Sequence, residues 1–155
     1  MSSYSFKASG KTQEQRLAEA LQKSQSPIGI KTPLRPGTTE GLFAMHFSLA
    51  DAVHDNLRNL LLTNHGERLG LYDFGANLRE LTSELVSADS FDSAAIERIK
   101  TAVAQWMPYV ELEDYESTVD RTDVRNTTAI VLTITYNVPS LGVKRRALQV
   151  TLHVI

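Results

Sequence analysis

The chain has 155 residues, of which 42% are hydrophobic, a net charge of −2 and no cysteine. This size and apolar content suit one globular domain with its own core. The lack of cysteine excludes disulfides, the common cysteine-based zinc sites and thiol catalysis. There is no apolar run of about 18 residues and no secretory leader at the start, so we expect cytosolic synthesis and no membrane partner.

Charge is unevenly distributed along the chain. Residues 1–40 carry a net charge of +3, residues 41–142 carry −8, and residues 143–155 carry +3. A chain that is acidic overall is not expected to bind nucleic acid in general. Two interpretations of the basic ends stay open. The basic ends are ordinary solvated surface, or they steer the docking of the protein onto acidic partners or neighbouring copies.

The amino-terminal quarter predicts an extended arm. A hydroxyl residue followed three positions later by glutamine predicts a short helix over about residues 12–24, too short to be stable without packing. The three prolines and two glycines of residues 24–39 indicate a linker or an extended segment. The sequence therefore divides into an arm, residues 1–40, and a domain, residues 41–155.

Helical periodicity marks the start of the domain. Residues 41–47 predict a short strand or an apolar lead-in, and regularly spaced leucine and valine predict a helix over residues 49–62. Asn64 and Gly66 are suited to end this helix. Residues 67–71 are expected to be extended.

Two further helices are predicted before the hydrophobic pattern changes from helical to strand periodicity. Leucines at spacings i, i+3 and i+7 from Leu78 mark one face of the first of them. The second is capped by Ser90 or Asp92 and ends near Trp106, since Pro108 disfavours helix at the residue before it.

The last third of the chain alternates with the period of β-strands. Strands are predicted over about residues 110–119, 130–138 and 147–154. They form an antiparallel meander with one buried face, which gives an α+β fold with helices on one face of three or four mainly antiparallel strands. No proline or bulge glycine interrupts the last strand. It is therefore either open to a partner strand or covered by residues 43–47.

The sequence contains no recognisable catalytic motif. The four histidines have spacings that prescribe no metal site, and nucleophile, phosphate-loop and dinucleotide motifs are absent. Glu67 lies beside Arg68, which would lower its pKa on contact, and the carboxylates from Glu111 to Glu116 should be solvated. We expect no metal, no cofactor and no enzyme activity.

Residues 63–68 read Thr-Asn-His-Gly-Glu-Arg, and residues 74–78 read Phe-Gly-Ala-Asn-Leu. These two short motifs resemble the lysozyme-like baseplate wedge proteins of contractile-tailed bacteriophages, a family shared with type VI secretion baseplates. The resemblance covers about residues 41–155. It also includes the helix that ends at Trp106 and Pro108. The turn motif consists of Gly66, Glu67, Arg68, Phe74 and Gly75.

The resemblance implies a structural protein of the virion tail baseplate. Its implied partners are baseplate wedge proteins, the tail sheath protein and, through the arm, tail tube or hub proteins. The terminal strand would initiate the sheath by strand exchange with its first ring. The residues implied in this contact are Lys144, Arg145, Arg146, Leu148, Val150, Leu152 and Val154.

This chain differs from the family pattern at the residues that contact the wedge. The family usually has Glu-Pro-Arg after the long helix, whereas this chain has Met107, Pro108 and Tyr109. The ionic contact is therefore not carried over. Met107 and Tyr109 either supply an apolar contact to the wedge or complete the core.

Two other functions compete with the baseplate interpretation. One is a protein-binding adaptor on the same fold that never polymerises, because fold alone does not determine function. The other is a lysozyme-type hydrolase, whose peptidoglycan turnover would be sensitive to Glu67→Gln.

Overall fold

The computed structural model describes residues 13–14, 16–17, 26–37, 41–83, 88–122 and 127–154. The chain forms two compact units, residues 1–52 and residues 53–155, which are described separately. The helix predicted over residues 12–24 lies mostly outside the described residues, and its described part is helical. Within the described ranges, no helix has the length and apolar character needed to cross a membrane.

The first unit contains a two-stranded antiparallel ribbon. Its strands are β1 (Gly29–Ile30) and β2 (Met45–His46), and an isolated bridge between Pro36 and Phe43 continues the pairing. The expectation of a short strand within residues 41–47 is confirmed. The ribbon joins residues on both sides of the predicted arm boundary.

The elements from residue 49 onward follow the predicted order of helices before strands. They are α2 (Leu49–Leu62), α3 (Leu78–Ser83), α4 (Ala88–Trp106), β3 (Glu111–Thr122), β4 (Thr127–Val138), the 3-10 turn η1 (Pro139–Leu141) and β5 (Val143–Val154). The prediction that Ser90 or Asp92 caps α4 is wrong, because the helix begins at Ala88. The Asp92 carboxylate accepts a hydrogen bond from Ser117 Oγ at 2.6 Å, so it ties α4 to β3 instead of capping the helix.

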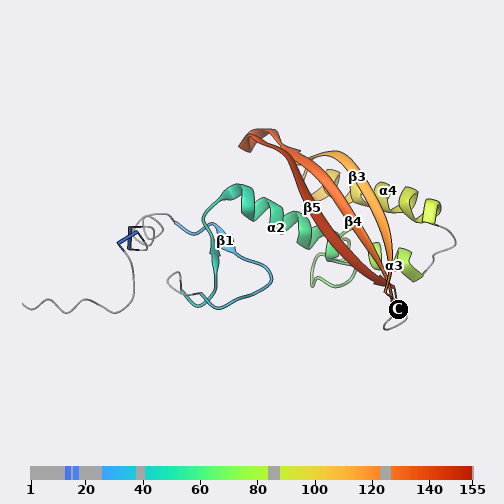
Figure 1. The fold of residues 1–155 in the computed structure, drawn as a ribbon, viewed down its shortest axis with the longest axis horizontal. Coiled ribbons are helices and arrows are strands. Elements are labelled where there is room, and N and C mark those ends of the chain that lie inside the picture. Colours follow the sequence, from blue (N-terminus) through green and yellow to red (C-terminus); the bar gives the residue numbers. More distant parts are fainter. Residues whose placement is uncertain are drawn as a thin grey trace, which may run out of the picture. The chain divides into compact units, whose positions relative to one another are not determined.

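The core of the second unit lies between the helices and one face of a three-stranded sheet, which confirms the α+β fold class (Figure 1). Alternate side chains of β4 and β5 face the helices, because successive strand residues point to opposite faces. The buried strand residues are Ile130, Leu132, Ile134, Tyr136, Val138, Leu148, Val150 and Leu152. Their main helical neighbours in the core are Leu57, Leu60, Leu61, Ile99 and Val103.

The strand order is β3-β4-β5, and both pairings are antiparallel. β4 is therefore central, and β5 is an edge strand. β2 pairs with β1 rather than with β5, and among the described residues β4 is the only strand paired with β5. The alternative in which residues 43–47 cover the last strand is thus excluded.

Residues 67–71 form consecutive turns, so the prediction of an extended segment is wrong. Gly66 and Gly70 have φ angles of 83° and 80°, which reverse the chain. The Gly66 N–H donates to the Tyr72 carbonyl at 2.7 Å and closes the loop.

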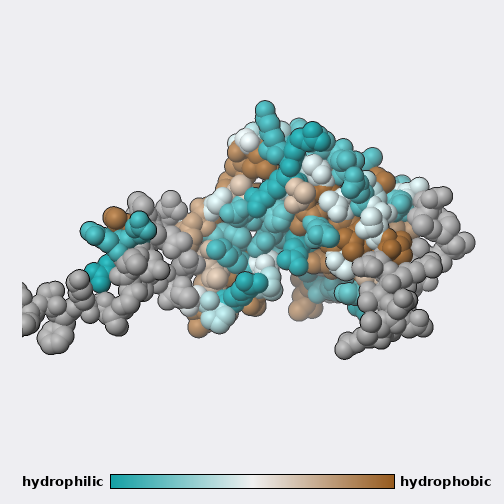
Figure 2. Space-filling model, viewed as in Figure 1, coloured by the Kyte–Doolittle hydropathy of each residue, from teal (hydrophilic) through white to brown (hydrophobic). Residues whose placement is uncertain are grey.

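Both outer strands carry a β-bulge at the same level of the sheet. In β3 the extra residue is Glu113, and in β5 Lys144 and Arg145 lie opposite the single residue Asn137. Arg145 has a φ of 49°, which residues other than glycine rarely adopt. The last strand is therefore interrupted without a glycine, contrary to the sequence-based expectation. Figure 2 shows both hydrophilic and hydrophobic residues at this end of the hairpin formed by β4 and β5.

Asn137 holds the two bulges together. Its side-chain Nδ2 donates to Glu113 Oε2 at 3.2 Å, and its side-chain Oδ1 accepts the backbone N–H of Arg145 at 2.7 Å. The Arg145 Nε atom also lies 3.4 Å from Glu113 Oε1. The backbone N–H of the bulged residue thus has a hydrogen-bond partner outside the strand ladder.

Replacing Asn137 with alanine should lower the free energy of unfolding by about 1–2 kcal/mol, because two hydrogen bonds are lost. Urea denaturation measures this change. Asn137→Asp is the matched control, since it keeps the acceptor for the Arg145 N–H but repels Glu113, and its effect should be smaller. Unchanged stability of Asn137→Ala would contradict the role assigned to this side chain.

Candidate functional site

The turn motif after α2 is built around a pairing of Asn64 with Glu67. Asn64 donates its backbone N–H to Glu67 Oε2 at 2.8 Å and its side-chain nitrogen to Oε1 at 2.9 Å. The Asn64 side-chain oxygen Oδ1 in turn accepts the backbone N–H of Arg79 at 3.3 Å. The motif therefore joins the end of α2 to the start of α3.

Arg68 stacks on an aromatic ring instead of pairing with an acid. Its guanidinium lies 3.7 Å from the centre of the Phe74 ring, and that ring meets Trp106 edge-on at 5.1 Å. This cation–π contact and the aromatic pair connect the turn to the end of α4. Within the described residues the Arg68 guanidinium lies over Phe74 and makes no ion pair.

Gly75 allows the turn to lie directly against α2. Its φ is 118°, and a Cβ at this position would lie 2.1 Å from the Thr63 carbonyl oxygen. The neighbouring Ala76 N–H donates to the Leu60 carbonyl at 3.1 Å. A side chain at Gly75 would therefore push the turn away from the helix.

Glu67 is unsuited to act as a catalytic acid. Hydrogen bonds from the side chain and backbone of Asn64, with a further contribution from the charge of Arg79, lower its pKa below the ordinary value. A general acid at neutral pH needs a raised pKa. Within the described residues, no group of three metal-binding side chains occurs.

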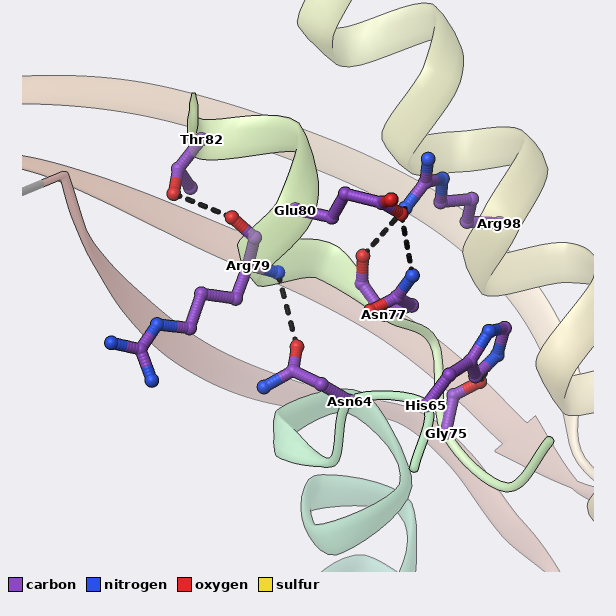
Figure 3. A network of polar contacts seen from close by, with 8 residues as sticks. All are labelled: Asn64, His65, Gly75, Asn77, Arg79, Glu80, Thr82 and Arg98. Atoms are coloured by element: carbon purple, nitrogen blue, oxygen red, sulfur yellow. Dashed lines mark hydrogen bonds and ion pairs between the residues drawn. The ribbon is translucent and has the colours of Figure 1, made fainter. Parts of the chain in front are cut away.

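A second polar network ties α3 to α4 (Figure 3). Glu80 Oε2 accepts hydrogen bonds from Asn77 Nδ2 at 2.6 Å and from Arg98 Nη1 at 2.8 Å. Arg98 Nη1 also donates to the Asn77 carbonyl at 2.7 Å. In the same view the Arg79 side chain extends away from these groups.

The three residues at the expected wedge contact have different environments. Met107 is buried in the core, whereas Pro108 is exposed and Tyr109 has 46% of its surface exposed. Met107 therefore completes the core, and Tyr109 is available to a partner. The structure brings this segment close to the turn motif, since Phe74 packs on Trp106 and Gln105 Nε2 donates to Asp73 Oδ2 at 3.0 Å.

The residues expected to contact the sheath are divided between two environments on β5. Leu148, Val150 and Leu152 are buried in the core, so only their backbone is available to a partner strand. Lys144 and Arg145 are exposed. Arg146 is partly buried, and of Val154 only the backbone, in β5, is described.

Sequence reasoning assigned Asn64 only to the end of α2 and did not single out Asn137. Asn64 carried a signal, because it precedes Glu67 by three residues, a spacing typical of side-chain hydrogen bonding in turns. Asn137 carried none, because its partners Glu113 and Arg145 come from separate strands.

A sequence profile described as Baseplate wedge protein gp25 matches residues 48–140. The chain belongs to this family. The resemblance seen in the sequence is thereby confirmed, and the wedge protein is a structural component of a phage-like tail baseplate. No curated protein matches the chain.

Two solved structures share the fold of the wedge protein. A chain in the cryo-EM structure of the anti-feeding prophage baseplate has a TM-score of 0.58 and 19% identity, covering 77% of this chain and 90% of that chain. A Geobacter sulfurreducens protein, proposed to be a tail lysozyme, has a TM-score of 0.54 and 23% identity, covering 72% of this chain and 97% of that chain.

Gly75→Ala should lower the free energy of unfolding of the wedge protein by about 3 kcal/mol or more, since it adds a backbone clash to the strain of positive φ. Gly70→Ala is the matched control. Gly70 also has a positive φ but no atom within 4 Å of an added Cβ, so about 1 kcal/mol is expected. Equal losses in thermal or urea unfolding would contradict the importance of the Thr63 contact.

Proposed function

We propose that this wedge protein attaches to the wedge core of a contractile tail and initiates sheath assembly through β5. The observation that carries this proposal is that β5 forms the edge of the three-stranded sheet. An edge strand presents unpaired N–H and C=O groups, to which an extended segment of another chain adds by backbone hydrogen bonding. The virion tail baseplate is the corresponding location.

Charge near the start of β5 favours an acidic partner. Among the described residues, Lys144 is exposed and makes no hydrogen bond or ion pair. Arg145 is already placed beside Glu113. Lys144 is therefore the residue of the basic cluster most readily available to steer the sheath protein to the edge strand.

The wedge contact is proposed at the end of α4 and the adjoining turn. Tyr109 is half-exposed, and the turn presents Leu69 and Tyr72 with 95% and 67% of their surfaces exposed. Aromatic and aliphatic side chains exposed together favour association with another protein. These apolar groups replace the charged contact expected from the family pattern.

The arm is proposed to bind tail tube or hub proteins. The ribbon of the first unit exposes apolar side chains, and a two-stranded ribbon alone is marginally stable in water. Its exposed apolar residues are Ile28, Ile30, Leu34, Leu42 and Phe43. A partner surface would remove them from water.

An adaptor that never polymerises is the competing function, and it predicts no tail genes beside this one. The proposed role requires no catalysis. The lowered pKa of Glu67 and its engagement by Asn64 support a non-enzymatic protein.

Particles that contain a chain lacking residues 143–155 should form baseplates and tubes without sheath, since the proposed strand contact is removed. Electron microscopy of tails measures the sheathed fraction. Immunoblotting of purified baseplates controls for incorporation, because the deletion also removes core residues. Normal sheath on particles with the incorporated, truncated chain would refute the proposal.

Tyr109→Ala combined with Leu69→Ser should reduce incorporation into baseplates by about tenfold, because the exposed apolar contact is lost. Quantitative immunoblotting of purified particles measures it. Val119→Ser, which alters an exposed apolar residue of β3 outside the proposed contacts, is the control and should leave incorporation unchanged. Full incorporation of the double variant would place the wedge contact elsewhere.

A further inference from the structure

A groove runs along the free edge of β5 near its carboxyl-terminal end. It has a volume of about 350 Å³ and is lined by β5 on one side and by α2, the turn motif and α3 on the other. Its lining includes Thr151, Leu152 and His153, consecutive residues whose side chains alternate between the faces of the sheet. No β4 residue lines it. The groove therefore lies at the strand's edge and not on a face of the sheet.

α3 limits how far a partner strand can pair with β5. Cα atoms of α3 and β5 lie within 8 Å of each other. Arg79 and Thr82 of α3 line the groove together with Thr151, Leu152 and His153 of β5, so α3 occupies the space beside this part of the strand. Regular pairing must therefore stop before the residues that line the groove.

The bulge limits pairing at the other end of β5. Lys144 and Arg145 both lie opposite Asn137, and Arg145 has a positive φ. A bulge disrupts the regular spacing of N–H and C=O groups along the strand. The uninterrupted and uncovered part of the edge is thus confined to residues 146–150.

Arg79 of α3 lies beside the groove. It lines both this groove and an adjoining hollow of about 580 Å³. Within the described part of the chain, the Arg79 side chain has no hydrogen bond or ion pair, and Figure 3 shows it extending away from the network. The carboxylate of Glu67, which lines the same groove, is already bound by Asn64. A guanidinium in such a position favours an incoming carboxylate.

We propose that the partner segment pairs with residues 146–150 and that Arg79 binds an aspartate or glutamate at the end of that segment. This rests on the proposed docking of the sheath protein at β5. The edge then accepts a short acidic segment in one register, because the bulge limits one end and the Arg79 ion pair anchors the other.

Arg79→Glu should lower the fraction of sheathed tails by about tenfold or more, whereas Arg79→Lys should retain much of it. Lys100→Glu is the matched control, because it makes the same charge change on the exposed surface of α4, away from both hollows. Replacing the partner's acid with lysine should restore sheathing to Arg79→Glu. Normal sheathing by Arg79→Glu, or equal loss with Lys100→Glu, would overturn the assignment.

Register is tested separately by disulfide cross-linking, which the absence of native cysteine makes clean. Gln149→Cys should cross-link to a cysteine scanned through the terminal segments of the sheath protein, since paired strands place Cα atoms about 4.5–5.5 Å apart. Lys144→Cys, within the bulge, should not. Cross-linking at Lys144 as efficient as at Gln149 would overturn the proposed limits. If neither position cross-links, strand docking itself fails, and the register proposal fails with it.

Cross-linking also covers the case in which Arg79→Glu fails to fold. Thermal unfolding of the purified variant identifies that case. In that case, cross-linking of Gln149→Cys in the otherwise unchanged chain tests whether the partner strand docks on β5. A cross-link at Gln149 together with normal sheathing by Arg79→Gln would leave strand docking intact and refute the ion pair.

Discussion

Burial of the inner face of β4 determines the packing and the strand register of the second unit. Five alternate side chains, from Ile130 to Val138, are almost completely buried beneath the helices. Burial of this apolar surface contributes about 25 cal/mol per Å², and a shift of one residue would turn every one of these side chains to solvent. The Tyr136 hydroxyl in this layer meets His54 Nδ1 at 2.9 Å, which satisfies the polar group. A buried central strand leaves β3 and β5 as the edges of the sheet.

The edges are then shaped by polar side chains. Asn137, whose position alternates with the buried residues of β4, reaches the bulges of both neighbours. At the opposite end of β5, α3 is positioned by the turn motif, because Asn64 accepts the Arg79 N–H while Gly75 allows close approach to α2. The family motif thus acts as a scaffold. It places α3 and Arg79 beside the edge strand and Phe74 against Trp106.

Much of the fold could be predicted because its signals are periodic. The spacing of leucines fixed α2 to its observed bounds, and the alternation from Ile130 to Val138 identified the buried face of β4. Errors occurred where the chain departs from a period. Residues 67–71 turn because of two glycines with positive φ, and the strands bulge at Glu113 and Arg145. Of the candidate site, the sequence supplied the turn motif but not the cation–π contact of Arg68 or the uncommitted Arg79.

The sequence by itself determined the class of the fold, the order of its elements and the family resemblance, since these depend on residue types at short spacings. Tertiary structure decided which strand edge is open, how far it is open, and which charges are already paired. Arg145 and Arg79 are both exposed in the structure, and nothing in the sequence distinguishes their surroundings. Only the folded chain places one beside Glu113 and the other at the groove along β5, because contacts between distant segments depend on packing and not on local spacing.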